Sequence, residues 1–155
     1  MIPVKQVMTT RVITIAEDTP VDDVAGTLRE HKITGAPVVS ADGHVVGIVS
    51  EVDVFSRRGE TAKEIMSPHV ISITEDTGVD EAARLLAGER IRRLPVMAKG
   101  RMVGLISRSD VLEFFATSHW TCATCGHTEH GLQQPESCRQ CQGTDFRLER
   151  ASPKS

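Results

Sequence analysis

The sequence predicts a mixed α+β protein, in which two β-α-β-β-α repeats are followed by a small module with four cysteines. Three observations predict this fold class. The first 117 residues contain an internal repeat, each copy carries alternating strand and helix patterns, and the four cysteines gather between residues 122 and 141. We divide the chain into a first repeat over 1–58, a second repeat over 59–117, a cysteine module over 118–150 and a tail over 151–155.

The internal repeat is the most informative of these observations about the fold, because a repeat reveals the architecture before any single element does. From Val4 to Val38, 15 of 35 positions are identical to the residues found 58 positions later. After a one-residue deletion near Ala41 the offset becomes 57, and the segment Gly47–Val54 then aligns with Gly104–Val111. Two copies of so small a unit predict a pair related by a pseudo-two-fold axis and sharing a core.

The first half of the first repeat reads as a strand and a helix. A short helical turn is expected near Pro3–Met8, and the β-branched residues of Val12–Ile15 predict a strand. Thr19 is the expected N-cap of a helix that begins at Pro20. One face of this helix is apolar at helical spacing, through Val21, Val24, Ala25 and Leu28.

The second half of the first repeat reads as a β-hairpin and a helix. An extended segment over Ile33–Pro37 leads into a strand over Pro37–Ser40. Asp42-Gly43 is a strong hairpin signal, and it predicts a return strand over Val45–Val49. A second helix is then expected over Glu51–Arg58.

The second repeat shows the same order of elements. Thr61–Glu64 has the spacing of a capping box, and Lys99-Gly100 marks the hairpin turn. The closing helix is predicted to face inward with Val111, Leu112 and Phe115. Strands are expected over Val70–Ile73, Leu94–Met97 and Arg101–Ile106. One helix is expected where Val79, Ala82, Ala83 and Leu86 form an apolar face, and another over Arg108–Thr117.

A Ser-x-x-Asp pattern stands at the same place in both repeats, where a strand runs into a helix. Ser50 and Ser107 occupy the N-cap, and Asp53 and Asp110 fall in the first turn. A helix start has a positive local field and free N–H groups, so it can hold a phosphate. A neighbouring carboxylate can accept hydrogen bonds from two adjacent hydroxyls, such as a ribose diol. The alternative is an ordinary cap and an ordinary first-turn acid, but two intact copies favour at least one nucleotide site.

The Gly-x-x-Ser-x-x-Asp ending of each copy and the Ile-x-x-x-Pro-Val segment at its centre make the repeats resemble CBS domains. A tandem pair of this kind resembles a Bateman module, and the resemblance covers about three quarters of the chain. It implies two α/β subdomains packed sheet to sheet around two clefts. Such clefts typically bind AMP, ADP, ATP or S-adenosylmethionine. Such modules often pair into homodimers, and a regulatory role implies a regulated protein that the sequence does not identify.

The resemblance also assigns roles to single residues. Asp53 and Asp110 match the ribose-binding aspartate, and Ser50 and Ser107 match the phosphate-contacting hydroxyl. The walls of the base pocket match Ile13, Thr14, Ile33, Thr34, Gly35 and Pro37 in the first copy, and Ile71, Ser72, Ile91, Arg92, Arg93 and Pro95 in the second.

In this family the aspartate of one repeat typically shares its cleft with the phosphate-contacting segment of the other. Asp53 is then expected to face Arg92-Arg93, and Asp110 is expected to face Thr34-Gly35. Guanidinium groups bind phosphate more strongly than neutral donors do, so the cleft of Asp53 is predicted to be the tighter one. The alternative interpretation of Arg92-Arg93 is a solvated charge pair.

The cysteines form two Cys-x-x-Cys knuckles that are separated by twelve residues. Two such knuckles can place four thiolates tetrahedrally around one ion, and the pattern resembles a zinc ribbon. The module has few large apolar side chains, so a bound metal must supply its stability. The predicted ligands of a structural Zn²⁺ are Cys122, Cys125, Cys138 and Cys141. Iron in a rubredoxin-like site is the main alternative, and His127 and His130 are possible substitute ligands.

Composition narrows the function classes. The formal net charge is −3, and residues 118–155 hold four basic and four acidic residues, so tight nucleic-acid binding is not favoured. There is no nucleophile–base set, Walker loop or dinucleotide fingerprint, so no enzyme activity is expected. Met1–Gln6 has no apolar run and no stretch approaches the ~20 apolar residues of a membrane span, which predicts a cytoplasmic protein without a membrane partner.

The predicted function is therefore a regulatory protein that senses an adenine nucleotide or S-adenosylmethionine. Its zinc ribbon is expected to serve partner docking or assembly. The alternative is a nucleic-acid-binding regulator, in which the ribbon reads the nucleic acid and the CBS pair acts as the effector domain.

Overall fold

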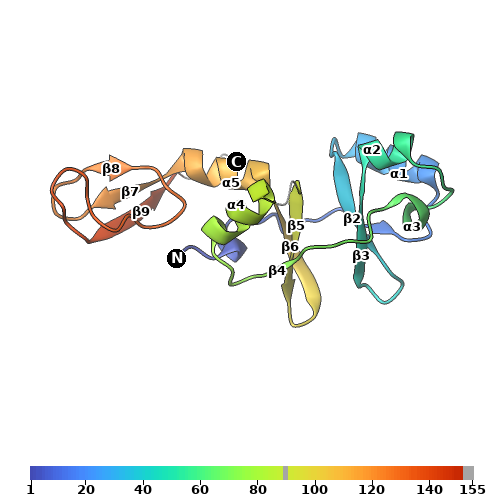
Figure 1. Cartoon of the computed structure of the whole chain (residues 1–155), viewed down its shortest axis with the longest axis horizontal. Coiled ribbons are helices and arrows are strands. Elements are labelled where there is room, and N and C mark those ends of the chain that lie inside the picture. Colours follow the sequence, from blue (N-terminus) through green and yellow to red (C-terminus); the bar gives the residue numbers. More distant parts are fainter. Residues whose placement is uncertain (89–90, 152–155) are drawn as a thin grey trace. The chain divides into compact units, whose positions relative to one another are not determined.

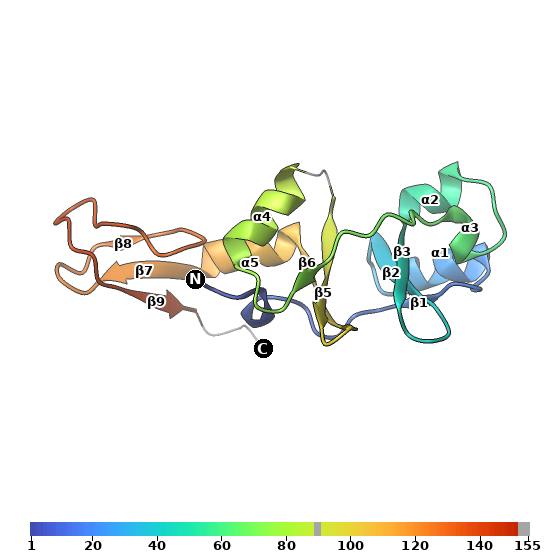
Figure 2. The same cartoon turned by 60° about the horizontal axis from the view of Figure 1, so that its bottom comes forward.

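The structure is a computed structural model that describes residues 1–88 and 91–151. The chain divides into two compact units. The central unit comprises Thr9–Thr74 and Leu94–Leu105, and the terminal unit comprises Met1–Met8, Glu75–Arg93 and Ile106–Ser155. The described residues form three three-stranded sheets. Figure 1 and Figure 2 show strands and helices along the chain, so the predicted α+β class is confirmed.

The first repeat forms a three-stranded sheet in the order β1-β2-β3. The strands are β1 (Ile15–Ala16), β2 (Gly35–Val39) and β3 (Val45–Ser50). β1 runs parallel to β2, so the chain needs a crossover, which α1 (Val21–Glu30) supplies. β2 and β3 form the predicted hairpin, and α2 (Glu51–Ser56) and α3 (Ala62–Ile65) follow.

The core around the sheet of the first repeat is aliphatic, and it includes Ala62, Ile65 and Met66 from the start of the second repeat. α1 contributes Val24 and Leu28, which lie one turn apart on the same helical face. The buried set is Ile15, Val24, Leu28, Ala36, Val38, Val49, Ala62, Ile65 and Met66. Gly47 of β3 is required by this packing, because an added Cβ would collide with the side chain of Met66 and the carbonyl of Ser67.

The second sheet repeats the order of the first as β4-β5-β6. Its strands are β4 (Ile73–Thr74), β5 (Arg93–Ala98) and β6 (Arg101–Ser107), with β4 parallel to β5. The turn between β5 and β6 is at Lys99 and Gly100, as predicted, with φ angles of 52° and 77°. Two successive positive φ values match the right-handed twist of a tight hairpin.

The terminal unit holds η1 (Val4–Gln6), α4 (Val79–Gly88) and α5 (Arg108–Thr117). It also holds the cysteine module, which is a sheet of order β8-β7-β9. The strands are β7 (Ser118–Cys122), β8 (Thr128–Glu129) and β9 (Phe146–Arg150), and β7 pairs antiparallel with both neighbours. α4 buries Val79, Ala82 and Leu86, and α5 buries Phe114. Within the described residues, none of the helices combines the length and the apolar character that a membrane crossing needs.

The first strand of each repeat begins later than predicted. The prediction Val12–Ile15 becomes Ile15–Ala16, and Val70–Ile73 becomes Ile73–Thr74. The β-branched residues before these strands favour an extended backbone, but a strand also needs a hydrogen-bonded neighbour. Pairing starts only at Ile15↔Val38 in the first repeat and at Ile73↔Val96 in the second.

Two predicted helix starts are also corrected. The N-cap of α1 is Pro20 rather than Thr19, and it makes no side-chain cap bond. The Val21 N–H donates to the carbonyl of Glu60, so backbone from the next loop satisfies this helix start. The capping box predicted at Thr61–Glu64 does not form, because the Glu64 carboxylate accepts from the N–H of Glu60 at 2.5 Å.

The inward face predicted for α5 is wrong in part. Leu112 and Phe115 are 66% and 41% exposed, whereas Phe114 is only 1% exposed. Five of the helix's residues are apolar and they lie on adjacent faces, so periodicity could not select between them. α2 also ends two residues earlier than predicted, at Ser56 instead of Arg58.

Candidate functional site

The Ser-x-x-Asp pattern of the first repeat forms a complete capping box at the start of α2. The Ser50 N–H donates to Asp53 Oδ2 at 2.9 Å, and the Asp53 N–H donates to Ser50 Oγ at 3.3 Å. Asp53 is only 9% exposed, which is unusual for a charged residue in a first turn. The box holds the carboxylate in one orientation, and a carboxylate has about four lone-pair sites, so acceptor capacity remains for a ligand.

The second repeat builds the same box at the start of α5. The Ser107 N–H donates to Asp110 Oδ2 at 2.9 Å, and the Asp110 N–H donates to Ser107 Oγ at 3.3 Å. The hydroxyl of Ser107 also lies 3.1 Å from Asp110 Oδ2 and 2.9 Å from the hydroxyl of Ser109. The cap interpretation is therefore correct in both repeats, and it is compatible with a binding role for the two aspartates.

In the first repeat, sheet register brings other predicted site residues to this box. Gly35 of β2 pairs directly with Ser50 of β3, and the Glu51 N–H donates to the carbonyl of Thr34 at 2.9 Å. Ile33 is half-buried beside this segment, and Pro37 is fully buried in β2. The structure thus gathers Ile33, Thr34, Gly35 and Ser50 at one edge of the sheet.

The remaining predicted residues lie where the strands begin. Ile13 and Thr14 precede β1, and Ile71 and Ser72 precede β4. Of these four, only Ile13 is half-buried, and the other three side chains are exposed. Before and within β5, Ile91 and Arg93 are half-buried, Arg92 is exposed and Pro95 is buried. That Arg92 and Arg93 share a cleft with Asp53 stays a prediction.

Arg57 is a candidate site residue that sequence reasoning missed. Its Nε lies 3.2 Å from Asp53 Oδ1, so the first-repeat aspartate has a cationic neighbour on its second oxygen. The position equivalent to Arg57 in the second repeat is Phe114, which is buried and apolar. The i, i+4 spacing of Asp53 and Arg57 was the available signal for this pair. The two boxes therefore differ in their surroundings.

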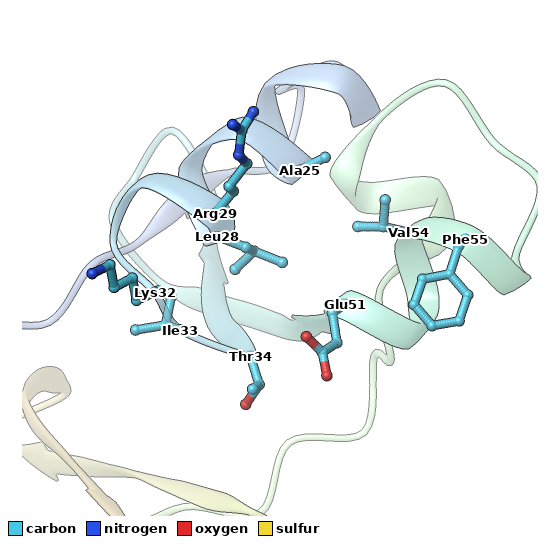
Figure 3. A pocket seen from close by; sticks show the side chains of 9 residues that line it. All are labelled: Ala25, Leu28, Arg29, Lys32, Ile33, Thr34, Glu51, Val54 and Phe55. Carbon is cyan, nitrogen blue, oxygen red and sulfur yellow. The ribbon is translucent and has the colours of Figure 1, made fainter.

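A groove lies between the two helices of each repeat. The groove of the first repeat has a volume of about 450 Å³, and Figure 3 shows Leu28 and Val54 lining its floor, with Thr34 and Glu51 at one end. The groove of the second repeat, of about 380 Å³, is lined by the equivalent positions Ala83, Leu86, Ala87, Arg108 and Val111. Asp53 and Asp110 line neither groove, so the grooves are distinct from the two boxes.

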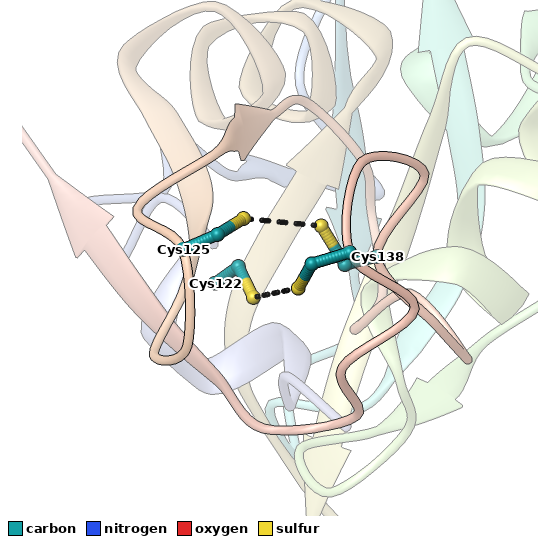
Figure 4. Close-up of side chains that lie close together, drawn as sticks. Cys122, Cys125 and Cys138 are labelled. Carbon is teal, nitrogen blue, oxygen red and sulfur yellow. Dashed lines mark hydrogen bonds between the residues drawn. The ribbon is translucent and has the colours of Figure 1, made fainter.

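The four cysteines converge, as the spacing predicted, at one end of the cysteine module (Figure 4). All four sulfur atoms lie within 4.8 Å of one another. The Cys122–Cys141 and Cys125–Cys138 sulfur pairs are each 3.6 Å apart, and all four thiols are free. A disulfide needs about 2.05 Å. Zinc–sulfur bonds of about 2.3 Å in a tetrahedron place the sulfurs about 3.8 Å apart, so the donor set fits a metal.

The backbone of the module also prepares the thiols for a cation. The Cys125 N–H lowers the pKa of Cys122 to about 6, since a backbone donor favours the thiolate. The Gly143 N–H also lowers the pKa of Cys141, but the neighbouring Cys125 thiol and burial outweigh it and raise that pKa to about 12. Without a cation, Cys122 ionises easily, whereas Cys141 resists ionisation beside it. A divalent metal would remove this resistance, because its positive charge offsets the repulsion between neighbouring thiolates.

The two histidines proposed as substitute ligands lie elsewhere. His127 Nε2 is 3.6 Å from Glu129, and His130 Nδ1 faces the backbone carbonyls of Phe115 and Ser118. Among the described residues, the only group of metal-ligating side chains that converges is the set of four cysteines.

Comparison with known proteins places both repeats in one family. The model of the CBS domain matches residues 4–60 and 62–117. The CBS domain-containing protein YhcV of Bacillus subtilis is 29% identical over 118 residues, which are 72% of this chain and 84% of YhcV. An inosine-5′-monophosphate dehydrogenase of Thermoplasma acidophilum is 35% identical over 103 residues, which are 65% of this chain.

The chain spans less than half of some of these relatives. It covers 21% of the dehydrogenase and 44% of protein MJ1225 of Methanocaldococcus jannaschii, to which it is 28% identical.

Two solved structures match closely in fold. One is CBSX2, a protein of Arabidopsis thaliana, in complex with AMP, with 31% identity and a TM-score of 0.68 over 72% of this chain and 94% of that one. The other is the CBS domain pair of protein MJ0100 in complex with 5′-methylthioadenosine and S-adenosyl-L-methionine, with 29% identity and a TM-score of 0.66 over 71% of this chain and 92% of that one.

Proposed function

The chain belongs to the CBS domain family, and we propose that it is a regulatory protein that binds an adenosine-containing ligand such as AMP or S-adenosylmethionine. The observation that carries this proposal is the duplicated Ser-Asp box. Each box holds a carboxylate beside a helix start through two hydrogen bonds, and the Asp53 carboxylate is also largely buried, at 9% exposure. A carboxylate held in this way can accept both hydroxyls of a ribose.

Two further features support this ligand class. Gly35 pairs with Ser50 and the Thr34 carbonyl accepts from the Glu51 N–H, so the segment expected to line the base pocket lies beside the box. The similar structures bind AMP in one case and two sulfur-containing adenosine derivatives in the other. Adenosine is the part that these ligands share. Ligand binding then regulates by favouring one arrangement of the protein over another. This requires that the ligand bind the two arrangements with different affinities.

Calorimetric titration tests the proposal. AMP and S-adenosylmethionine are titrated separately into the full chain, and the double variant Asp53→Ala/Asp110→Ala serves as the control that lacks both ribose acceptors. We expect saturable heat with at least one of the two ligands and none in the control. Equal binding by the wild type and the double variant would show that the boxes are plain helix caps.

The second part of the proposal is that the four cysteines hold one structural Zn²⁺ in a ribbon-like module. Four thiolates leave no open coordination position, so a catalytic role is not proposed. Metal analysis of natively purified protein should find about one zinc per chain. A visible absorption band from iron–thiolate charge transfer would contradict zinc, since zinc thiolates are colourless.

The third part is self-association through the helical faces. Phe55 of α2 lines the first groove and is 77% exposed, and Leu112, at the equivalent position of α5, is 66% exposed. A second copy of the chain could bury these two large apolar side chains, and burial of apolar surface is the dominant favourable contribution to most protein association. Light scattering should report a species above the chain mass of 16.9 kDa, and Phe55→Lys should lower it. A monomer at micromolar concentration would contradict this part.

A further inference from the structure

Helix α5 joins the second-repeat box directly to the cysteine module. The box at Ser107 and Asp110 begins the helix, and its last residue, Thr117, is followed without a loop by β7. β7 ends at Cys122, the first of the four metal-ligating cysteines. A ten-residue helix is about 15 Å long and resists bending, so its two ends cannot move independently. One rigid element therefore carries both candidate sites of the terminal unit.

The cysteine module covers the C-terminal end of α5. His130 Nδ1 lies 2.8 Å from the carbonyls of both Phe115 and Ser118, and its ring stacks on Phe115 at 5.2 Å between centroids. The Ala151 N–H donates to the carbonyl of Thr117 at 2.8 Å. The last carbonyls of a helix have no partner within the helix. Here the module supplies those partners, so the end of α5 depends on the module being folded.

Arg150 makes a second contact between the module and α5. Its guanidinium lies 5.3 Å from the ring centre of Phe114, the buried residue of the helix. The same guanidinium donates to the carbonyl of Gln6 at 3.3 Å. Arg150 thus joins β9 to α5 and to the N-terminal segment.

The N-terminal segment gives a second route from the module to the helices. Ile2 packs against the module core of Trp120, Cys122, Cys138 and Phe146. The Val79 N–H, at the start of α4, donates to the carbonyl of Ile2 at 2.8 Å. α4 in turn meets the second-repeat box, because Arg108 of α5 donates to the carbonyl of Leu86 at 3.0 Å.

We infer that metal binding by the four cysteines and ligand binding at Asp110 are linked, with each strengthening the other. The module has too small an apolar core to fold without metal, and its folded form completes the end of α5 and holds residues 2–6. A ligand at Asp110 must then order more of the chain when the metal is absent. Linkage is reciprocal, so bound ligand must also raise metal affinity. This inference rests on the proposed function for its ligand.

A titration in single-site variants tests the linkage. Asp53→Ala keeps only the second-repeat box, and Asp110→Ala keeps only the first. AMP is titrated into both full-length variants, once loaded with zinc and once stripped with a chelator. We expect stripping to weaken AMP binding about tenfold in Asp53→Ala and to leave Asp110→Ala unchanged. Equal affinity of loaded and stripped Asp53→Ala would overturn the linkage.

Hydrogen exchange tests the same linkage without any ligand. In the full chain, the amides of residues 111–117 and 2–6 should exchange faster after the metal is stripped, while those of β2 and β3 keep their protection. Unchanged exchange in residues 111–117 overturns the linkage even if AMP binds. If AMP binds neither variant, AMP is not the ligand, and the exchange result still decides whether the metal supports α5.

A matched pair of arginine variants tests the route through β9. Arg150→Ala removes the contacts to Phe114 and Gln6, whereas Arg147→Ala changes an exposed arginine on the same strand. Both variants retain the four cysteines and should retain zinc. In the Asp53→Ala background, Arg150→Ala should weaken AMP binding about two- to fivefold, as expected for one cation–π contact. If Arg150→Ala behaves like Arg147→Ala, Arg150 does not transmit the linkage.

Discussion

The first repeat and the cysteine module are stabilised by different means. The core around the sheet of the first repeat buries aliphatic side chains from β1, β2, β3, α1 and α3, and it contains no cysteine. The core of the module is Trp120, Phe146 and the two buried cysteines Cys122 and Cys138, with Ile2 and Leu148 packed against it. Burial of aliphatic side chains therefore organises the repeats, whereas the module has a small core that Ile2 helps to cover, and we propose that a metal supplies the rest of its stability.

Removal of the metal should have the largest effect and should separate the two regions. Cys138→Ser leaves three thiolates and an unsatisfied coordination position, so residues 119–150 should lose their ordered structure. Amide NMR spectra should show collapsed dispersion for the module, while the signals of the first repeat stay in place. Gln140→Ser, in the same knuckle but not a ligand, should retain the metal. A Cys138→Ser variant with an intact module spectrum would disprove the metal-dependent fold.

A truncation in the core around the first-repeat sheet should show the converse behaviour. Ile65 of α3 has no exposed surface, and Ile65→Ala should lower the free energy of unfolding by about 2–5 kcal/mol. Zinc content should stay unchanged. Urea denaturation followed with metal analysis measures both quantities. Val52→Ala is the control, because Val52 is 51% exposed and should change stability by less than about 0.5 kcal/mol. Loss of zinc in Ile65→Ala would mean that the two regions are not separately stabilised.

The two aspartate variants should sharpen the comparison at the level of ligand binding. The family pairing predicts that Asp53 belongs to the tighter site, and one charge-assisted hydrogen bond to phosphate corresponds to about tenfold in affinity. Asp53→Ala should remove the tighter AMP event, and Asp110→Ala should affect only a weaker one. Isothermal titration resolves the two events. If Asp110→Ala removes the tight event instead, the order predicted for the two sites is reversed.

Removal of the cap hydroxyls should have the smallest effect. Ser50→Ala and Ser107→Ala each leave one N–H of a helix start without its side-chain acceptor, which should cost about 0.5–2 kcal/mol of stability. Thermal unfolding measures this loss. Ser56→Ala, at the end of α2 and away from the box, is the control. A larger loss for Ser107→Ala than for Ser50→Ala is expected if α5 also supports the module.

The aspartate boxes and the cysteine cluster were predictable because their geometry is local. Ser50 and Asp53 are three residues apart, and a helix start brings that spacing together whatever surrounds it. The knuckles Cys122–Cys125 and Cys138–Cys141 are equally short, so only their approach to one another needed the fold. The turn at Lys99-Gly100 was predictable for the same reason, since its residues tolerate positive φ.

Other features depended on distant parts of the chain. Val12–Thr14 has the residues of a strand but lacks a paired neighbour, and a strand exists only where a neighbour supplies hydrogen bonds. In α5, apolar residues on adjacent faces left the buried side undecided, until Arg150 from β9 was placed over Phe114. The packing of Ile2 on the cysteine core could not be predicted either, because it joins distant parts of the sequence.

The sequence alone was therefore enough to predict the duplicated α+β architecture, the two boxes and the convergence of the four cysteines. These follow from backbone preferences and ligand spacings that act over a few residues. Only the tertiary structure decided which face of α5 is buried, where β1 and β4 begin, and that Ile2 and Arg150 join the module to the helices. Those outcomes depend on contacts between residues that are 23 positions apart for Ile15 and Val38 and 144 positions apart for Arg150 and Gln6, and no local pattern encodes such contacts.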